Sequence, residues 1–229
     1  MSVPGISVII PAFNAARYLG EALESVRAQT LQPLETIVVD NGSTDATAEI
    51  ARQWGARCEH EPRRGSAHAR NRGATVARGD FFAMLDADDL CAPQRFEWQM
   101  EALLADPRLE AVFGLMEQFP SPDLAPEEAA AIHCPAGAQP ARLPNLMMIR
   151  REAFERVGPF SPEMGLADIV DWFSRAEAAG LRHVVPPHLV LRRRLHANNA
   201  GRGERATRGD YLRAIKQRLD RARAAGGAP

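Results

Sequence analysis

Three aspartates stand within four consecutive residues of this chain, at Asp86, Asp88 and Asp89. They follow the apolar run 81–85, which predicts a buried strand. Asp86 and Asp88 are two residues apart, so extended backbone would point both side chains the same way. Crowded carboxylates repel one another unless a cation or proton neutralises them, and carboxylate oxygens suit Mg²⁺ or Mn²⁺. The pattern indicates a divalent-metal site; the alternative is a polar turn in which Asp89 caps the next helix.

A second carboxylate, Asp40, ends the apolar run 36–39 and precedes a turn. Turn and capping chemistry accounts for Ser43, Thr44 and Asp45, but it accounts less well for Asp40. A carboxylate at the end of a buried strand can accept an N–H group from a nucleotide base. Asp40 is therefore a candidate base-binding residue.

Gly65 and Arg70 form a third candidate group at the start of an expected helix over residues 67–76. Glycine permits close approach of the backbone to a ligand, and arginine can bind a base or a phosphate. The alternative places Arg70 and Arg72 on a solvated helix face. The chain contains neither G-x-G-x-x-G nor G-x-x-x-x-G-K-[ST], which argues against dinucleotide-binding and P-loop folds.

The elements that must position these residues alternate between strand and helix. This alternation predicts an α/β fold, a single three-layer αβα domain with a mainly parallel twisted sheet. Ligands of such sheets bind beyond the carboxyl ends of the strands, where Asp40 and Asp86 stand. The proline-rich segment 117–144 is expected to be a loop or lid with one short helical patch at 127–132. Strands are expected at 6–10, 36–39, 56–60, 81–85, 146–149, 184–185 and 189–195, and helices at 15–29, 44–54, 67–76, 93–104, 151–157 and 168–179.

Composition excludes several classes of protein. The 229 residues are 45% hydrophobic and 25% charged with a formal net charge of −1, which is typical of a globular domain and gives no global attraction to nucleic acid. The cysteines lack metal-ligand spacing and indicate free thiols in a reducing compartment. Neither a signal peptide nor a membrane span is expected, so we predict a cytoplasmic protein, with peripheral membrane contact left open. The three cysteines are Cys58, Cys91 and Cys134.

Taken in order, four motifs resemble the family-2 glycosyltransferases of GT-A fold, which invert the anomeric carbon of a nucleotide-activated sugar. The match is close over residues 5–115 and looser beyond. The motifs are Ser7-Val8-Ile9-Ile10-Pro11-Ala12-Phe13-Asn14, then Val38 to Thr47, Gly65 with Ala69-Arg70-Asn71, and Asp86-Ala87-Asp88-Asp89.

This resemblance implies roles for individual residues. Asp86 would contact the ribose and Asp88 would bind Mn²⁺ or Mg²⁺ on the diphosphate. Uridine diphosphate is the implied carrier of the hexose. Asn41 stands where the family commonly has a second acid, a change expected to have little consequence. The nucleoside would be held by Pro11, Phe13 and Asp40, with Asn14 beside them and Arg70 close to the nucleotide.

In the second half, Gly158-Pro159-Phe160 resembles the family's G-x-F element, and Asp171 with Arg175 match the end of its catalytic helix. An ungapped count places Ile169 at the usual catalytic aspartate, whereas a shift of one residue gives that role to Asp168. Asp168 is therefore the first candidate for the general base and Asp171 the second. The alternatives are a helix-dipole partner for Asp168 and an i,i+4 ion pair with Arg175 for Asp171.

A late element, Arg194-Leu195-His196-Ala197-Asn198-Asn199, resembles the family's R-x-H-x-x-N motif. His196 would then bind the metal or donate to the departing diphosphate, and Arg194 would add positive charge there. The alternative for His196 is an ordinary hydrogen-bonded histidine.

These expectations divide the chain into a glycosyltransferase domain over residues 1–204 and a basic amphipathic helix and tail over 205–229. Within the domain, residues 1–115 would bind the donor and 116–204 the acceptor, which is a glycan, peptide, lipid or small metabolite. Two other functions stay open: a weak or inactive relative that binds a nucleotide sugar, because of Ile169, and an interaction module acting on membranes or nucleic acid through the tail.

Overall fold

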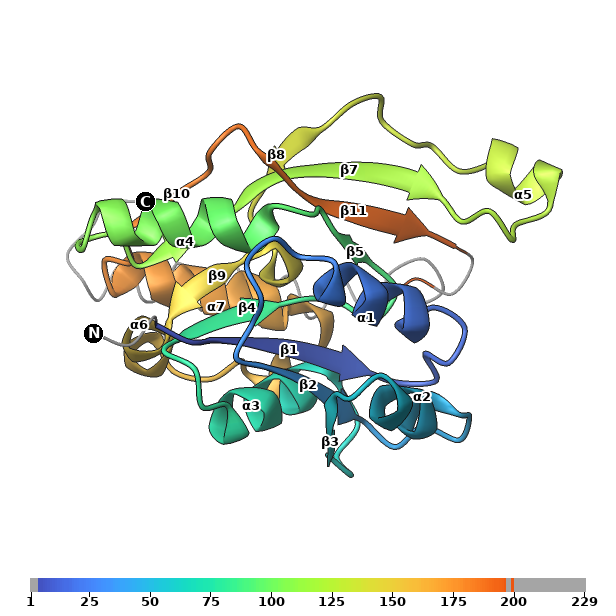
Figure 1. Ribbon diagram of the computed structural model, residues 1–229, viewed down its shortest axis with the longest axis horizontal. Helices are drawn as coiled ribbons and strands as arrows, with labels where there is room; N and C mark the ends of the chain where they lie inside the picture. Colours follow the sequence, from blue (N-terminus) through green and yellow to red (C-terminus); the bar gives the residue numbers. More distant parts are fainter. Residues whose placement is uncertain (1–3, 197–198, 200–229) are drawn as a thin grey trace.

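The computed structural model describes residues 4–196 and residue 199 of the chain. Two sheets form its centre. The larger sheet has the strand order β10-β6-β9-β4-β1-β2-β3, and the smaller has the order β5-β11-β7-β8 (Figure 1). The strands are β1 (Ile6–Ala12), β2 (Glu35–Asp40), β3 (Arg57–His60), β4 (Phe81–Met84), β5 (Leu90–Cys91), β6 (Ala111–Val112), β7 (Gly114–Pro120), β8 (Gln139–Ala141), β9 (Met148–Arg150), β10 (His183–Val184) and β11 (Leu189–Leu195).

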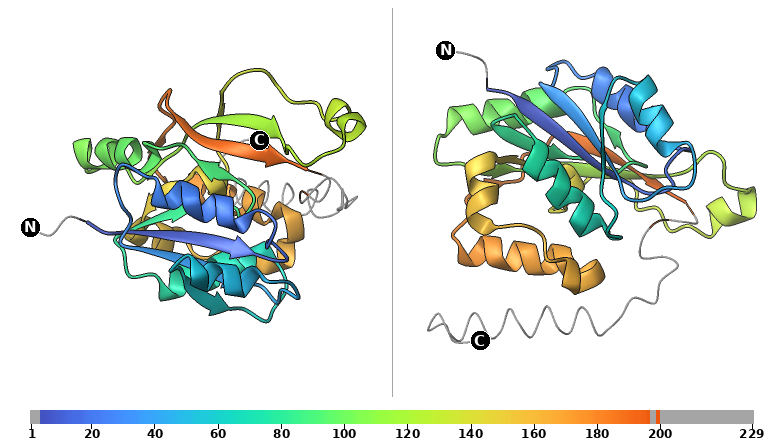
Figure 2. Two further views of the ribbon diagram at one scale, coloured as in Figure 1. Left: turned by 45° about the vertical axis from the view of Figure 1, so that its right-hand side comes forward. Right: turned by 90° about the horizontal axis from the view of Figure 1, so that it is seen from below.

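Helices cover both faces of the larger sheet. Figure 1 shows α1 and α4 on the side of the smaller sheet and α3 on the opposite side, and the view from below in Figure 2 places α6 and α7 beside α3. The helices are α1 (Leu19–Arg27), α2 (Thr47–Gln53), α3 (Ser66–Val76), α4 (Arg95–Ala105), α5 (Pro126–Ala130), α6 (Arg151–Val157) and α7 (Asp168–Ala178), with 3₁₀ turns η1 (Pro144–Leu146) and η2 (Pro162–Ala167).

The predicted α/β class and its mainly parallel sheet are confirmed. Strand β1 pairs in parallel with β2 and β4, whereas β9 runs antiparallel to β4 and β6. Because β1 lies inside the sheet with helices on both faces, its apolar residues are fully buried, among them Val8, Ile9 and Ile10. The carboxyl ends of β2, β1 and β4 therefore lie side by side.

Close packing of α3 on β1 depends on Gly73, which lies in the middle of the helix. A Cβ atom at this position would lie 2.4 Å from Cγ2 of Ile9, a fully buried side chain that cannot move away. We expect Gly73→Ala to lower the free energy of unfolding by about 1–3 kcal/mol, measured by urea denaturation. Gly20→Ala in α1 is the control: the nearest atom there is 3.6 Å away, so higher helix propensity should leave stability equal or increased. Equal stability of Gly73→Ala and wild type would contradict this packing.

The expectation of a loop throughout 117–144 was wrong at its two ends. Strand β7 continues to Pro120, and β8 pairs antiparallel with it and completes the smaller sheet. The prolines obscured both strands in the sequence. Pro120 is the last residue of its strand and Pro140 lies in an edge strand, and both are positions where the absence of an N–H is tolerated. The predicted helical patch is present as α5.

Two expectations concern the chain ends and membranes. The predicted helix and tail over 205–229, and with them the boundary at 204, lie outside the described residues. Within residues 4–196, none of the helices is long and apolar enough to cross a membrane.

Candidate functional site

The donor-side residues gather where β1 and β2 end. Ala12 of β1 is paired with Asp40 of β2, so the residues that follow each strand face one another. Asp40 is mostly buried, and its Oδ1 accepts the N–H of Ser43 at 3.0 Å. Its Oδ2 lies 3.8 Å from Nδ1 of His60, the last residue of β3. Asp40 is thus fixed by its own turn, with its second oxygen at the sheet edge.

Asn14 links the two strand ends. It adopts a φ of 46°, a left-handed conformation that asparagine tolerates better than most residues. Its backbone N–H donates to Oγ of Ser43 at 3.0 Å, and its Oδ1 accepts the N–H of Thr44 at 2.9 Å. Pro11 is the partner of Val39 in the sheet, and Phe13 is 44% exposed. An exposed aromatic residue therefore directly follows Ala12, the residue of β1 that is paired with Asp40.

Asn41 fixes the loop that approaches this aromatic ring. The buried amide donates to the carbonyl of Glu61 at 2.8 Å and to that of Arg63 at 2.6 Å, and Oδ1 accepts the N–H of Gly65 at 2.7 Å. A carboxylate could accept from Gly65 but could not donate to either carbonyl. The Asn41 amide therefore has a structural role that the sequence did not indicate, and the expectation that this replacement has little consequence stays a prediction.

We expect Asn41→Asp to lower the free energy of unfolding by about 1–3 kcal/mol, because two buried carbonyls lose their donors and face a negative charge. Chemical denaturation measures this directly. Asn14→Asp is the matched control: only Oδ1 of Asn14 is used, so its stability should stay within about 0.5 kcal/mol of wild type. Equal effects of the two substitutions would refute the role assigned to the Asn41 amide.

Arg70 is buried and lies between two candidate acids, so its alternative placement on a solvated helix face was wrong. Its Nη2 donates to Oδ1 of Asp86 at 3.0 Å. Its Nη1 lies 3.6 Å from Oδ2 of Asp168, too far for a hydrogen bond, and neither of these two atoms has another partner in the described structure. The guanidinium group thus connects the carboxylate after β4 with the first residue of α7.

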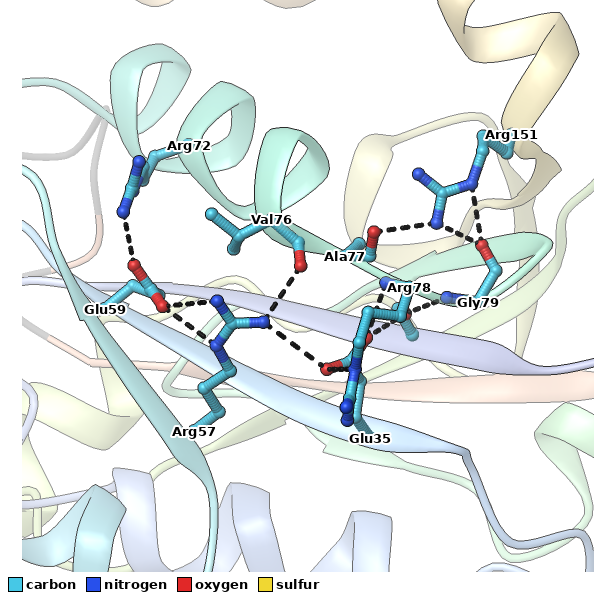
Figure 3. Close-up of polar contacts among 10 residues, drawn as sticks. Glu35, Arg57, Glu59, Arg72, Val76, Ala77, Arg78, Gly79 and Arg151 are labelled. Carbon is cyan, nitrogen blue, oxygen red and sulfur yellow. Dashed lines mark hydrogen bonds and ion pairs between the residues drawn. The ribbon is translucent and has the colours of Figure 1, made fainter.

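Arg72, two residues along the same helix, belongs to a separate network. Its Nη2 donates to Glu59 of β3 at 2.6 Å, and Glu59 also binds Arg57 (Figure 3). Arg57 in turn reaches the carbonyl of Val76 and lies within 3.8 Å of Glu35, as the same view shows. Arg72 therefore fastens α3 to the sheet edge and is not directed toward the candidate site.

Asp168 begins α7 with its side chain almost completely buried. Burial raises the pKa of Asp168; the positive charge of Arg70 and the N–H of Ile169 oppose that shift, and the charges of Asp86 and Asp171 add to it. Asp168 is therefore a carboxyl group with an elevated pKa held beside an arginine, which is a favourable environment for a general base.

Asp171 faces a different set of partners on the same helix. Its Oδ2 accepts from Nε of Arg175 at 2.9 Å and from Oγ of Ser161 at 2.7 Å. Arg175 also donates to the carbonyls of Val157 and Pro159. This is the i,i+4 ion pair that the spacing allows, and it fixes the loop that joins α6 to α7.

At the other end of the candidate site, Asp88 and His196 approach one another across 108 residues of sequence. His196 Nε2 lies 2.9 Å from Oδ2 of Asp88, and Nδ2 of Asn199 donates to the same oxygen at 3.1 Å. The Asp88 side chain is 29% exposed, whereas that of His196 is 8% exposed. An imidazole nitrogen therefore lies within hydrogen-bond distance of a carboxylate whose side chain is partly exposed.

Two of the three adjacent aspartates, Asp86 and Asp88, are open to ligands; the third, Asp89, is buried. Asp89 accepts the N–H of Arg194 at 3.0 Å and the amide of Asn145 at 2.7 Å. Burial raises the pKa of Asp89 well above its usual range, and the charges of Asp88 and Asp86 raise it further. Asp89 thus holds β11 against the turn after β4, a structural role beyond the cap considered from the sequence.

Arg194 holds the backbone of Asp88 in place. Its side chain is 1% exposed, and its guanidinium carbon lies 4.8 Å from the centroid of the Tyr18 ring and 5.0 Å from that of Phe119. It donates through Nε to the backbone carbonyl of Asp88 at 3.1 Å and through Nη2 to Glu21 at 2.7 Å. Its observed contacts are therefore with the protein, and direct contact with a diphosphate stays a prediction.

Tyr18 is the residue of this cluster that sequence reasoning missed. Its ring lies 4.7 Å from the His196 ring, and its hydroxyl group donates to Asp123 at 3.1 Å. It therefore links the Asp88–His196 pair to the segment after β7. An aromatic residue at the start of a helix looks like core packing in a sequence, so no local signal distinguished it.

Comparison with known proteins places this geometry in context. A sequence model of the family described as "Glycosyl transferase family 2" matches residues 7–158. Glycosyltransferase AglE of Haloferax volcanii is 31% identical over 196 residues, covering 78% of this chain and 63% of that protein. The putative glycosyltransferase EpsH of Bacillus subtilis is 34% identical over 102 residues, covering 42% of this chain and 30% of that protein. The chain thus spans about a third to two thirds of the length of these relatives.

Solved structures share the fold. The S. aureus protein TarS, in complex with UDP-GlcNAc, superposes with a TM-score of 0.76 at 17% identity, covering 95% of this chain and 66% of that one. The mannosyltransferase PcManGT of Pyrobaculum calidifontis, in complex with GDP-Man and Mn²⁺, has a TM-score of 0.69 at 28% identity and covers 100% of this chain and 67% of that one.

Proposed function

This chain belongs to glycosyl transferase family 2, and we propose that it transfers a sugar, with inversion, from a nucleotide-diphosphate donor to an acceptor hydroxyl group in a divalent-metal-dependent reaction. The observation that supports this most strongly is the approach of His196 to Asp88, just after the end of β4. The neighbouring strand ends are those of β1, which Phe13 follows, and of β2, which Asp40 ends. The residues proposed to bind the base and those proposed to bind the cation thus lie at the same, carboxyl end of neighbouring parallel strands.

The residues present fit a divalent cation that binds together with its substrate. The described residues contain no group of three or more His, Cys, Asp or Glu side chains that could hold an ion by themselves. Mg²⁺ and Mn²⁺ commonly bind through one or two protein ligands together with substrate phosphates. Asp88 and His196 would hold such an ion, which would neutralise the charge that develops on the diphosphate leaving group. A UDP-sugar or a GDP-sugar as the donor is consistent with the two similar structures, which contain UDP-GlcNAc and GDP-Man.

The remaining residues of the chain would orient donor and acceptor. Phe13 offers an aromatic face for the base, Asp40 accepts from the base, and Asp86 accepts from the ribose hydroxyl groups. Asp168 would take the proton of the acceptor hydroxyl as that oxygen attacks the anomeric carbon. Asp168 is enclosed in this structure, so it must be uncovered when the acceptor binds. Asp171, held by Arg175 and Ser161, is the second candidate.

The test is a screen of nucleotide sugars, in which release of the nucleoside diphosphate is measured with Mn²⁺, with Mg²⁺ and with EDTA. Slow transfer to water allows such a screen before the acceptor is known. We expect release from one UDP- or GDP-sugar that EDTA abolishes. Release that is insensitive to EDTA would contradict the metal dependence. Binding of a nucleotide sugar without turnover, for any acceptor offered, would favour the inactive relative suggested by Ile169.

A further inference from the structure

Arg64 occupies the aromatic face that the proposed function reserves for a nucleobase. Its guanidinium carbon lies 3.1 Å from the centroid of the Phe13 ring. Stacked aromatic rings need their centroids about 4.5–7 Å apart, so a base and the Arg64 guanidinium cannot share this face. Any base that stacks there must first displace Arg64.

The backbone of this loop is held by hydrogen bonds from Asn41, whereas the Arg64 side chain lies at the surface. The Asn41 amide holds the carbonyls of Glu61 and Arg63 and the N–H of Gly65 on either side of it. The Arg64 residue itself is exposed, and its hydrogen bond within the described structure is from Nη1 to the carbonyl of Asn41 at 3.2 Å. Displacement therefore requires rotation of one long side chain and leaves the loop in place.

The positive charge of Arg64 indicates what its displaced guanidinium group would bind. Arg63 is paired with Glu61 through two of its nitrogens, whereas Arg64 has no carboxylate within ion-pair distance among the described residues. A guanidinium group without a carboxylate partner, beside the proposed base platform, can bind phosphate oxygens in a bidentate manner.

We propose that Arg64 selects nucleotides over nucleosides: it covers Phe13 in the free protein and moves from the ring to the phosphates of an incoming nucleotide. An uncharged nucleoside must break the Arg64–Phe13 contact without compensation. A nucleoside diphosphate replaces that contact with a charge-assisted hydrogen bond. The inference rests on the proposed function, because it takes Phe13 as the base platform.

The test compares uridine with UDP by isothermal titration calorimetry and ligand-observed NMR, using wild type, Arg64→Ala and Arg64→Lys. An exposed cation–π contact corresponds to about a two- to fivefold change in affinity, so Arg64→Ala should bind uridine that much more tightly. It should also lose a charge-assisted bond to UDP, so that its preference for UDP over uridine is about tenfold smaller. Arg64→Lys keeps the charge but cannot form the bidentate contact, so its affinity for UDP should lie between those of Arg64→Ala and wild type. Guanosine and GDP replace this pair if the wild type binds guanine nucleotides.

Arg108→Ala, which removes an exposed arginine from the turn after α4, is the charge control and should change neither affinity. Uridine binding that is no tighter in Arg64→Ala than in wild type, including binding undetectable in both, would overturn the proposal. An unchanged preference for UDP would overturn it as well. If the wild type bound neither UDP nor GDP, the proposed function itself would fail, which is a different result from binding that does not depend on Arg64.

Discussion

Replacing Asp88 with asparagine is expected to reduce kcat/KM for sugar transfer at least about 100-fold and to abolish stabilisation of the protein by Mn²⁺ with a nucleoside diphosphate. The Asp88 side chain is the more exposed member of the Asp88–His196 pair, and the neutral amide of asparagine is a poor ligand for a hard cation. Thermal unfolding with and without Mn²⁺ and UDP or GDP gives the binding result, and kinetics give the rate.

Two controls separate metal binding from folding. Glu24→Gln removes an exposed charge from α1 and should behave as wild type. Asp89→Asn alters the buried neighbour that accepts from Arg194 and Asn145, and we expect it to lower stability in the absence of ligand. An Asp88→Asn protein that kept Mn²⁺-dependent stabilisation and transfer would show that the cation binds elsewhere.

Replacing Asp168 with asparagine is expected to lower kcat by about 10²–10⁴-fold with little change in nucleotide affinity, because it removes the proton acceptor and leaves the donor contacts intact. Asparagine preserves the acceptor for the Ile169 N–H. Asp171→Asn is the comparison: it weakens the Arg175 and Ser161 contacts, so lower stability is the expected effect. If Asp171→Asn lost activity at full stability while Asp168→Asn stayed active, the two roles would be reversed.

The raised pKa of Asp168 predicts a pH dependence of the wild-type protein that Asp168→Asn should lack. A base must be ionised, so wild-type kcat/KM should fall with decreasing pH at a higher pH than an exposed aspartate would give. The folded state also binds this proton more tightly than the unfolded state. Wild-type stability relative to Asp168→Asn should therefore decrease as pH rises from the ordinary aspartate pKa through the folded pKa. At neutral pH the variant should be at least as stable as wild type, as differential scanning calorimetry can show.

Much of the fold was predictable because the local sequence pattern identifies most of its strands and helices. The buried strands of the first half are short apolar runs, and β11 was found with its full bounds at 189–195. The smaller sheet could not be anticipated, because β8 and the end of β7 contain prolines that a local pattern assigns to loops. Their pairing arises from contacts distant in sequence, such as β7 with β11.

Some residues of the candidate site were likewise predictable from the local sequence, and others were not. Asp40, Asp86 and Asp88 were identifiable because each follows a buried strand and because the motif order resembles a known family. The support behind them depends on residues far apart in the chain. Burial of Arg194 against Tyr18 and of Arg70 between Asp86 and Asp168 is decided by packing, which helical spacing does not show. Arg64 gave no signal because an arginine in a loop is ordinarily solvated.

We propose that a divalent cation and a nucleoside diphosphate bind together at Asp88 and His196. Electron paramagnetic resonance titration of Mn²⁺ tests it most directly, with the wild-type protein alone, with UMP or GMP, and with UDP or GDP. We predict weak Mn²⁺ binding to the protein alone or with the monophosphate, and much tighter binding with the diphosphate that Asp88→Asn abolishes. Mn²⁺ affinity that is the same in all three conditions, or that persists in Asp88→Asn, would contradict the account.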